Sequence, residues 1–303
     1  MPLCAAIVNP HAAAGRAARL WPDVARRLES RLGPVLARFT ERGGHAINLA
    51  GELLREGRDR IFVAGGDGTV NEVANGFFDR GRPLQPDAAL AILPVGSGSD
   101  LCRTLGIPRS LRDAIDALAA GVVRLIDVGH ARYRAHDGAA QERLFVNIAS
   151  FGLGGDAAAR ARTASYPRAI LQAVLHQQPK QVRIRLDASE EELSLPVADV
   201  AVGNGRFQAG GIQVCPAASP DDGLFDVTVV ELFGLLELLG ALRLLFSGNI
   251  YRHPKVRHYR TAGLSADSAD SVPLELDGEP LGTLPLEITL LPRCLPMVVP
   301  QNQ

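Results

Sequence analysis

The chain has 303 residues, a length typical of two domains, and its 47% hydrophobic and 21% charged residues are ordinary globular composition. Lys and Arg number 32 against 33 Asp and Glu, a net charge of -1, which excludes a strongly basic polyanion-binding protein, so no nucleic-acid partner is expected. The 4 cysteines are far apart and form no CxxC pair. We therefore expect neither a disulfide framework nor a cysteine zinc site, and a cytoplasmic location is favoured.

No export or membrane-spanning segment is expected. The first apolar run ends at Asn9 and Pro10, follows no basic segment, and is too short for a signal peptide. The most apolar later stretch, residues 232–246, contains Glu237 and Arg243 and falls short of the ~20 apolar residues that a spanning helix needs.

The first 120 residues alternate short apolar runs with helical patterns. Apolar side chains at Leu20, Val24, Leu28 and Leu32 recur every four residues, as on one face of a helix. The same patterns predict strands at residues 3–8, 35–39, 61–64 and 88–93, and further helices at residues 46–54 and 70–78. Strands that alternate with helices predict a parallel sheet with helices on both faces.

The pattern changes near residue 121, beyond which strands dominate. Strands are predicted at residues 122–128, 143–148, 181–186, 197–202, 225–230, 256–259, 272–276, 286–290 and 297–299, and helices at residues 155–176 and 232–246. A strand-rich second half predicts a sandwich-like domain. We therefore expect an α/β domain over residues 1–125 and a β-sandwich domain over residues 126–303.

The strongest motif lies between the strand predicted at residues 61–64 and the next helix. It consists of Gly65, Gly66, Asp67, Gly68, Thr69, Asn71 and Glu72. Glycines allow a close backbone approach to a ligand, and the N-terminus of a helix favours phosphate. Asp67 is a carboxylate suited to the magnesium ion of a nucleotide, and Thr69 is a candidate helix cap. A tight strand–helix turn with a capping residue is the alternative interpretation.

This segment resembles the GGDGTxNE signature of the diacylglycerol kinase catalytic family, the lipid kinases that include sphingosine and ceramide kinases. NAD kinases and phosphofructokinases also use a Gly-Gly-Asp-Gly loop. Further segments, however, resemble the same family in order along nearly the whole chain. The resemblance implies that the seven residues from Gly65 to Glu72 named above bind ATP.

Three more segments resemble nucleotide-binding parts of that family. The first is similar to its Asn-Pro-x-x-x-x-Gly loop and comprises Asn9, Pro10, His11, Ala12, Ala13 and Gly15. Thr40 matches a nucleotide-contacting threonine at a strand end, and Ser97 matches a nucleotide-binding threonine or serine. Ser99 replaces the usual asparagine, which puts its side-chain contacts in doubt. A plain capping turn is the alternative for Asn9 and for Thr40.

Two acidic segments resemble the functional loops of the second domain. Ser219, Asp222 and Leu224 match a magnesium-binding loop, Asp222 by its carboxylate and the other two by backbone oxygens. Asp277, Gly278 and Glu279 match the Asp-Gly-Glu motif, from which Glu279 is the first candidate for proton acceptor and Asp277 the second. A hairpin turn is the alternative for both segments.

The resemblance implies an ATP- and Mg2+-dependent lipid kinase in lipid metabolism. It implies a Rossmann-like nucleotide domain followed by a β-sandwich, with the active site in the cleft between them and the last strands returning to the first domain. Diacylglycerol, phosphatidylglycerol and sphingoid lipids all remain open as the acceptor.

Two rival functions also remain open. An NAD-kinase-like enzyme with a soluble substrate shares the glycine loop, although the segments at Asp222 and Asp277 argue against it. A non-catalytic lipid or nucleotide sensor would keep the fold, and Ser99 is the departure that points towards it.

The expected partners are a lipid substrate and, transiently, a membrane surface. Residues 232–246 are strongly apolar, and residues 252–260 contain four fixed positive charges. Such a pair of segments is able to dock on an anionic bilayer, although a core helix is favoured for the first. No oligomeric state is predicted.

Overall fold

The computed structural model describes residues 3–96, 98–155, 180–187, 192–232 and 235–301. The chain divides into two compact units: unit 1 comprises residues 1–128 and 292–303, and unit 2 comprises residues 129–291. Strands β7 (Val122–Ala135) and β19 (Glu279–Val299) each continue from one unit into the other. Within the described residues, no helix is both long enough and apolar enough to cross a membrane.

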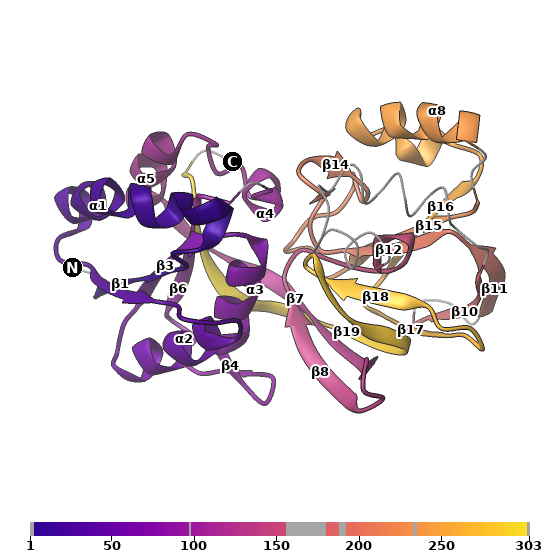
Figure 1. Ribbon diagram of the computed structural model, residues 1–303, viewed down its shortest axis with the longest axis horizontal. Helices are drawn as coiled ribbons and strands as arrows, with labels where there is room; N and C mark the ends of the chain where they lie inside the picture. The colour runs from indigo at the N-terminus through magenta and orange to yellow at the C-terminus, as the bar shows by residue number, and fades with distance from the viewer. Residues whose placement is uncertain (1–2, 97, 156–179, 188–191, 233–234, 302–303) are drawn as a thin grey trace. The chain divides into compact units, whose positions relative to one another are not determined.

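Unit 1 is built on a parallel sheet in the order β2-β1-β3-β6, with the end of β19 parallel to β6 (Figure 1). The bounds are β1 (Cys4–Val8), β2 (Leu36–Phe39), β3 (Arg60–Gly65) and β6 (Ala89–Pro94). Residues of β1 and β6 are buried throughout, because helices cover both faces of the sheet.

Five helices surround this sheet among the residues described in unit 1. They are α1 (Ala12–Leu32), α2 (His45–Arg55), α3 (Asp67–Gly76), α4 (Asp100–Thr104) and α5 (Leu111–Ala119), and a small hairpin joins β4 (Phe78–Asp79) to β5 (Arg82–Pro83). Helix α1 packs with α5, and α2 packs with α3. Trp21, Val24, Leu28 and Leu32 form the buried stripe of α1, so the predicted spacing is confirmed at its last three positions, whereas Trp21 is buried in place of the predicted Leu20.

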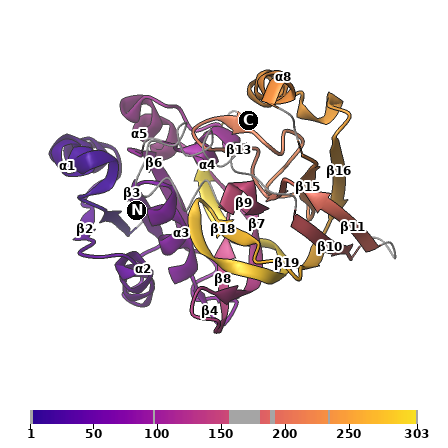
Figure 2. The same cartoon turned by 45° about the vertical axis from the view of Figure 1, so that its right-hand side comes forward.

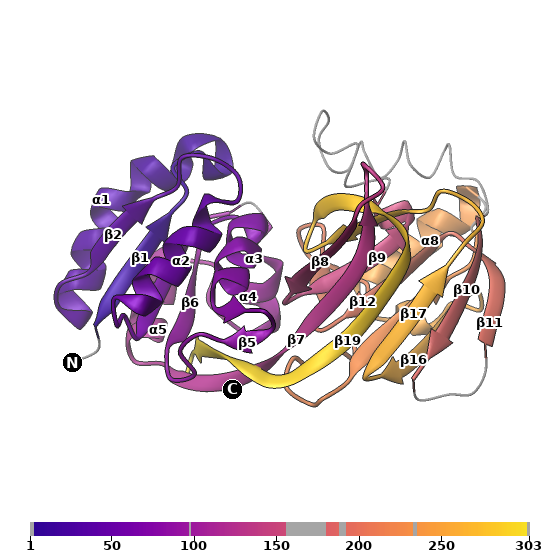
Figure 3. The same cartoon turned by 90° about the horizontal axis from the view of Figure 1, so that it is seen from below.

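Unit 2 is a β-sandwich whose two antiparallel sheets share β19. One sheet runs β16-β15-β12-β9-β18-β19, and the other runs β11-β10-β17-β19-β7-β8; Figure 3 shows β19, β17 and β10 side by side. The remaining bounds are β8 (Ala140–Phe145), β9 (Ile148–Gly152), β10 (Lys180–Leu186), β11 (Glu192–Val197), β12 (Asp199–Gly203), β15 (Phe225–Val230), β16 (Val256–Thr261), β17 (Gly263–Asp267) and β18 (Pro273–Leu276).

The sandwich core lies between the inner faces of these sheets. Phe145, Phe151 and Phe225 are fully buried in it, and the Phe145 and Phe225 rings stack at 5.6 Å. Helix α8 (Leu235–Phe246) lies over the β16–β15 end of the unit, beside a 3-10 turn (Ile250–Arg252) and a hairpin of β13 (Phe207–Gln208) and β14 (Ile212–Gln213) (Figure 2). The predicted order of an α/β domain followed by a β-sandwich is confirmed.

Two predicted strand assignments are wrong in detail. The single strand predicted at residues 143–148 is two strands, because the chain leaves β8 after Phe145 and its next backbone N–H groups bind the Asp277 carboxylate. The strands predicted at residues 286–290 and 297–299 are parts of one strand, β19. The helix predicted at residues 155–176 lies almost entirely outside the described residues.

The packing of α2 against α3 depends on Gly76. A Cβ at this position would lie 2.4 Å from the Ile47 carbonyl oxygen and 2.6 Å from the Ala50 Cβ. We predict that Gly76→Ala lowers the free energy of unfolding by about 1–3 kcal/mol, as overpacking does. Gly43→Ala, where nothing lies within 4 Å, is the control in thermal unfolding. Equal melting temperatures for the two variants would contradict this account.

Candidate functional site

Three loops follow the carboxyl ends of the parallel strands of unit 1. Strands β1, β3 and β6 end at Val8, Gly65 and Pro94, so the loops after them start at one edge of the sheet. The Asn9 side-chain amide donates a hydrogen bond of 2.9 Å to the Thr69 hydroxyl, which links the first loop to the start of α3. Ligands of open α/β sheets bind at this edge.

A cavity of about 170 Å³ lies at this edge. It is lined by Asn9, His11, Thr40, Arg42, Gly43, Thr69 and Glu72. Five of these seven residues are among the nucleotide contacts predicted from the sequence, and they come from three separate segments of the chain. The structure thus brings these segments together, while nucleotide binding by them stays a prediction.

The loop after β1 has a strained backbone. Ala13, Ala14 and Gly15 have φ of 50°, 54° and 79°, in the left-handed region that alanine rarely adopts. His11 donates its backbone N–H to the Asn9 side-chain oxygen at 3.0 Å, and Pro10 stands between them in the turn. Strain of this kind concentrates at binding sites, where the surrounding structure holds it in place.

Asp67 links the loop after β3 to the loop after β6. Its carboxylate accepts hydrogen bonds from the backbone N–H of Ser99 at 3.1 Å and of Asp100 at 3.2 Å. A Cβ at Gly96 would lie 2.8 Å from the Gly66 Cα, so the two loops touch through glycines. Ser99 has φ 51°, a conformation that asparagine tolerates better. Ser97 lies outside the described residues.

Glu72 links α3 to α2, and Asn71 is bonded within α3. The Glu72 carboxylate accepts hydrogen bonds from the backbone N–H of Gly44 at 2.8 Å and of Ala46 at 3.2 Å, and so caps α2. Asn71 is buried, and its side-chain oxygen accepts a bond of 3.2 Å from Asn75. These two side chains therefore have structural contacts besides the nucleotide contacts predicted for them.

Sequence reasoning missed a second, basic cavity of about 150 Å³ in unit 1. Arg16, Arg103 and Arg109 line it together with backbone of the loop after β6. Arg103 lies 3.5 Å from the Asp100 carboxylate. The three arginines belong to different helices or loops, so no local pattern in the sequence marks them as a group.

Asp277 has a structural role in unit 2. One carboxylate oxygen accepts the backbone N–H of Val146 at 2.9 Å, and the other accepts those of Asn147 at 2.9 Å and Ile148 at 3.0 Å. Asp277 is buried with φ 50°, and Gly278 follows it in the tight turn. Its catalytic role stays a prediction, because these bonds engage both oxygens.

Glu279, the other carboxylate of that turn, forms an ion pair. The Arg143 guanidinium lies 2.8 Å from its Oε2, and neither side chain is fully exposed. Burial raises the pKa of the neighbouring Tyr133, an effect that Arg143 opposes and Glu279 reinforces. Arg143 thus holds the Glu279 carboxylate in place, which the sequence motif alone does not show.

Sequence reasoning also missed Glu275, two residues before Asp277. It is fully buried, and its Oε1 accepts hydrogen bonds from the Ser150 hydroxyl at 2.8 Å and from the Gln208 amide. Burial raises the pKa of Glu275 to about 8, with the charges of Asp277 and Asp199 adding to the effect and the Ser150 bond opposing it. Alternation along β18 would have placed this residue on an exposed face.

The carboxylate of the predicted magnesium loop is engaged by protein groups, and binding of Mg2+ by this loop stays a prediction. Asp222 pairs through Oδ2 with Arg260, and its Oδ1 accepts the Leu224 backbone N–H at 3.1 Å. The Ser219 hydroxyl donates to Asp221 at 3.0 Å. Among the described residues, no group of three or more His, Cys, Asp and Glu side chains is arranged to hold a metal ion.

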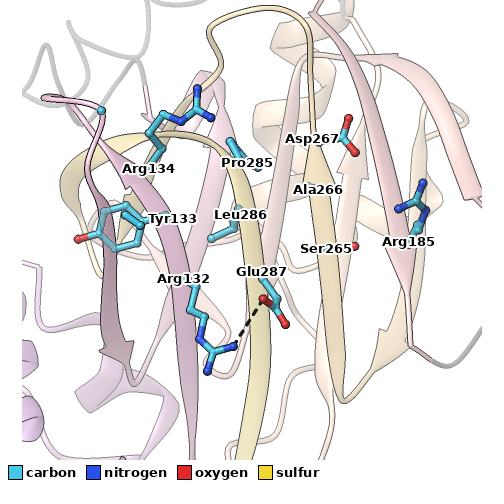
Figure 4. Close-up of a pocket in the computed structure, with 12 residues that line it drawn as sticks. Arg132, Tyr133, Arg134, Arg185, Ser265, Ala266, Asp267, Pro285, Leu286 and Glu287 are labelled. Atoms are coloured by element: carbon cyan, nitrogen blue, oxygen red, sulfur yellow. Dashed lines mark ion pairs between the residues drawn. The ribbon is translucent and has the colours of Figure 1, made fainter. Parts of the chain in front are cut away.

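A groove of about 490 Å³ lies on the face of the sheet formed by β7, β19, β17 and β10 (Figure 4). Arg132, Arg134 and Arg185 line it together with Asp267 and Glu287, and Arg132 lies 3.7 Å from Glu287. Charges of both signs line this groove, and it contains none of the residues predicted to be functional.

The comparisons with known proteins cover most of the chain. Residues 4–131 match the diacylglycerol kinase catalytic domain, and residues 153–299 match the YegS C-terminal NAD kinase beta sandwich-like domain. A diacylglycerol kinase of Staphylococcus saprophyticus is 30% identical over 92% of this chain and 89% of that protein. A probable lipid kinase YegS-like of Chromohalobacter salexigens is 30% identical over 88% of this chain and 84% of that protein.

A solved structure agrees with these matches. The crystal structure of a putative diacylglycerol kinase from Bacillus anthracis has a TM-score of 0.78 and 25% identity, and the match covers 98% of this chain and 97% of that one. The α/β unit and the β-sandwich of this chain correspond to the two matched domains. The chain belongs to the diacylglycerol kinase catalytic family.

The buried carboxyl of Glu275 predicts a pH dependence of stability. Its folded pKa, about 8, lies above the ordinary value of 4.5, so between these values the folded state binds more protons than the unfolded state. Its contribution to stability is therefore full below about pH 4.5 and is lost as the pH rises towards 8. We expect Glu275→Gln, which cannot ionise, to flatten the fall in melting temperature from pH 5 to 8.

The exposed Glu287→Gln is the control for this measurement. It should leave the pH profile of the melting temperature unchanged. Parallel profiles for the wild type and Glu275→Gln would show that this carboxyl does not titrate across the window.

Proposed function

We propose that this protein is an ATP-dependent lipid kinase that phosphorylates a hydroxyl group of a lipid such as diacylglycerol. One observation carries the nucleotide half of the proposal: the cavity beside Asn9, Thr40 and Thr69 lies at the carboxyl edge of a parallel sheet. The acceptor half is supported by the family, since its relatives bear the names diacylglycerol kinase and lipid kinase.

The loop after β3 suits the phosphate end of ATP. A side chain at Gly65 would meet Thr69 at 2.5 Å, so only glycine permits this turn, whereas nothing lies within 4 Å of the Cβ position of Gly66. Backbone at Gly66 is therefore accessible to a ligand. Arg16 and Arg103, in the second cavity of unit 1, supply positive charge of the kind that phosphates require.

Mg2+ would accompany ATP and, when bound, neutralise charge on the phosphates. Asp67 is our candidate to hold it. Its carboxylate lies between the loops after β3 and β6, where it accepts the backbone N–H of Ser99 and of Asp100, and carboxylate oxygens are ligands that Mg2+ prefers.

Transfer needs a group that accepts the proton of the lipid hydroxyl. The bond between the γ-phosphorus and its bridging oxygen breaks, the lipid oxygen bonds to that phosphorus, and the hydroxyl proton passes to a base. We assign the base role to Glu279, because its carboxylate is partly exposed and is oriented by Arg143. Asp277 stabilises the turn that carries Glu279, through the backbone of residues 146–148.

The direct experiment is incubation of the protein with γ-labelled ATP, Mg2+ and a total lipid extract, followed by mass identification of the labelled product. We expect a phosphorylated lipid. The same mixture with NAD instead of lipid tests the NAD-kinase-like rival. Label in NADP with none in lipid would replace our proposal, and retained ATP binding with no transfer to any lipid would support the non-catalytic sensor.

Glu279→Gln separates base catalysis from folding. The amide keeps the shape of the side chain but loses its basicity, so kcat should fall about 10²–10⁴-fold with little change in the melting temperature. Asp277→Asn should lower the melting temperature as well. The two oxygens of Asp277 accept three backbone N–H groups, and the amide replaces one of these oxygens with an NH2 donor. Near-normal kcat in Glu279→Gln would remove Glu279 from the mechanism.

A further inference from the structure

Arg260 lies where the resemblance to the kinase family implies a bound cation. It is on β16, directly opposite Asp226 on β15 in the antiparallel register. Its Nη2 forms an ion pair with Asp222 Oδ2, and its Nε lies 3.7 Å from Asp226 Oδ2. One guanidinium therefore contacts two carboxylates, one in the loop and one on the strand that follows.

The other oxygen of each carboxylate is also in contact with a protein group, whereas Asp226 Oδ2, 3.7 Å from Arg260, accepts no hydrogen bond from the described residues. Asp222 Oδ1 accepts the Leu224 backbone N–H at 3.1 Å, which closes the turn after Asp222. The other oxygen of the fully buried Asp226 contacts His258 Nε2. The His258 ring stacks on Tyr251 with centroids 4.1 Å apart and planes at 19°, which fixes its orientation.

A divalent cation and Arg260 are therefore alternatives at Asp222. A guanidinium at Asp222 repels a divalent ion that approaches either oxygen of the same carboxylate. Arginine is suited to this role because it stays charged at every physiological pH and its planar fork is able to bind two carboxylates at once.

We propose that Arg260 is the built-in counter-ion of this loop and that it takes the place of a bound metal ion. The loop between β14 and β15 is then ordered without Mg2+, whereas the Mg2+ of Mg-ATP remains a separate requirement of the nucleotide. The proposal concerns the folded state of unit 2 and does not rest on the proposed function.

Thermal unfolding without nucleotide tests it, in EDTA and in a series of millimolar MgCl2 concentrations at constant ionic strength. The wild type should melt at the same temperature in both. Arg260→Gln should melt lower in EDTA, since Asp222 and Asp226 lose their shared cation. It should also regain about 2–4 °C as Mg2+ fills the vacated position. The double variant Arg260→Gln with Asp222→Asn should melt low and show no response to Mg2+.

Arg257→Gln is the matched control. Arg257 lies on the same strand, is exposed, and pairs with Glu231 at 2.9 Å, away from the Asp222 loop. Its loss removes one positive charge but opens no position at Asp222, so no response to Mg2+ is expected. Arg260→Lys, which keeps the charge, should remain independent of Mg2+.

Three results would overturn the proposal. A wild-type melting temperature that rises with Mg2+, and no longer does so in Asp222→Asn, would make the loop a metal site. An Arg260→Gln variant that behaves like Arg257→Gln would make Arg260 an ordinary surface ion pair. A response to Mg2+ that persists in the double variant would place the ion elsewhere. None of these results depends on kinase activity, so a failed lipid assay leaves the test intact.

Discussion

A parallel sheet buried on both faces can present polar ligand-binding groups only at its strand ends, and the candidate nucleotide site depends on this constraint. Strands β1 and β3 end side by side at Val8 and Gly65, and the loops that follow are joined by the bond from Asn9 to Thr69. Asp67 then ties the loop after β3 to the loop after β6 through two backbone N–H groups. Glycines at the loop contacts are required because the backbones touch there.

Much of this arrangement could be predicted from the sequence, because it follows from local sequence patterns. Apolar periodicity located strands β1, β2, β3 and β6 and helices α1, α2 and α3, and glycine spacing located the turn at Gly65, whereas α4 and α5 were not predicted. Features set by distant contacts could not be predicted. The break between β8 and β9 exists because the carboxylate of Asp277, which is distant in sequence, accepts hydrogen bonds from three backbone N–H groups there. Glu275 is buried because β18 is covered on both faces, which alternation does not reveal.

Carboxylates in this protein differ by what compensates their charge. Asp277 is held by backbone N–H groups, Glu279 by Arg143, Asp222 by Arg260, and Glu275 by a raised pKa that favours its neutral form. A sequence motif identifies the carboxylate but not its partner. The partner of each carboxylate is visible only in the structure. These partners leave Glu279 as the candidate base and give Asp277 and Glu275 structural roles.

Calorimetric titration with Mg-ATP tests most directly whether ATP binds at the carboxyl edge of the sheet in unit 1. Thr69→Val keeps the size of the side chain but removes the hydroxyl that Asn9 contacts. Ser30→Ala removes a hydroxyl from the exposed part of α1 and is the control. The account predicts a Kd about 3- to 10-fold weaker for Thr69→Val and unchanged for Ser30→Ala. Equal affinities in all three proteins, or no binding by the wild type, would contradict it.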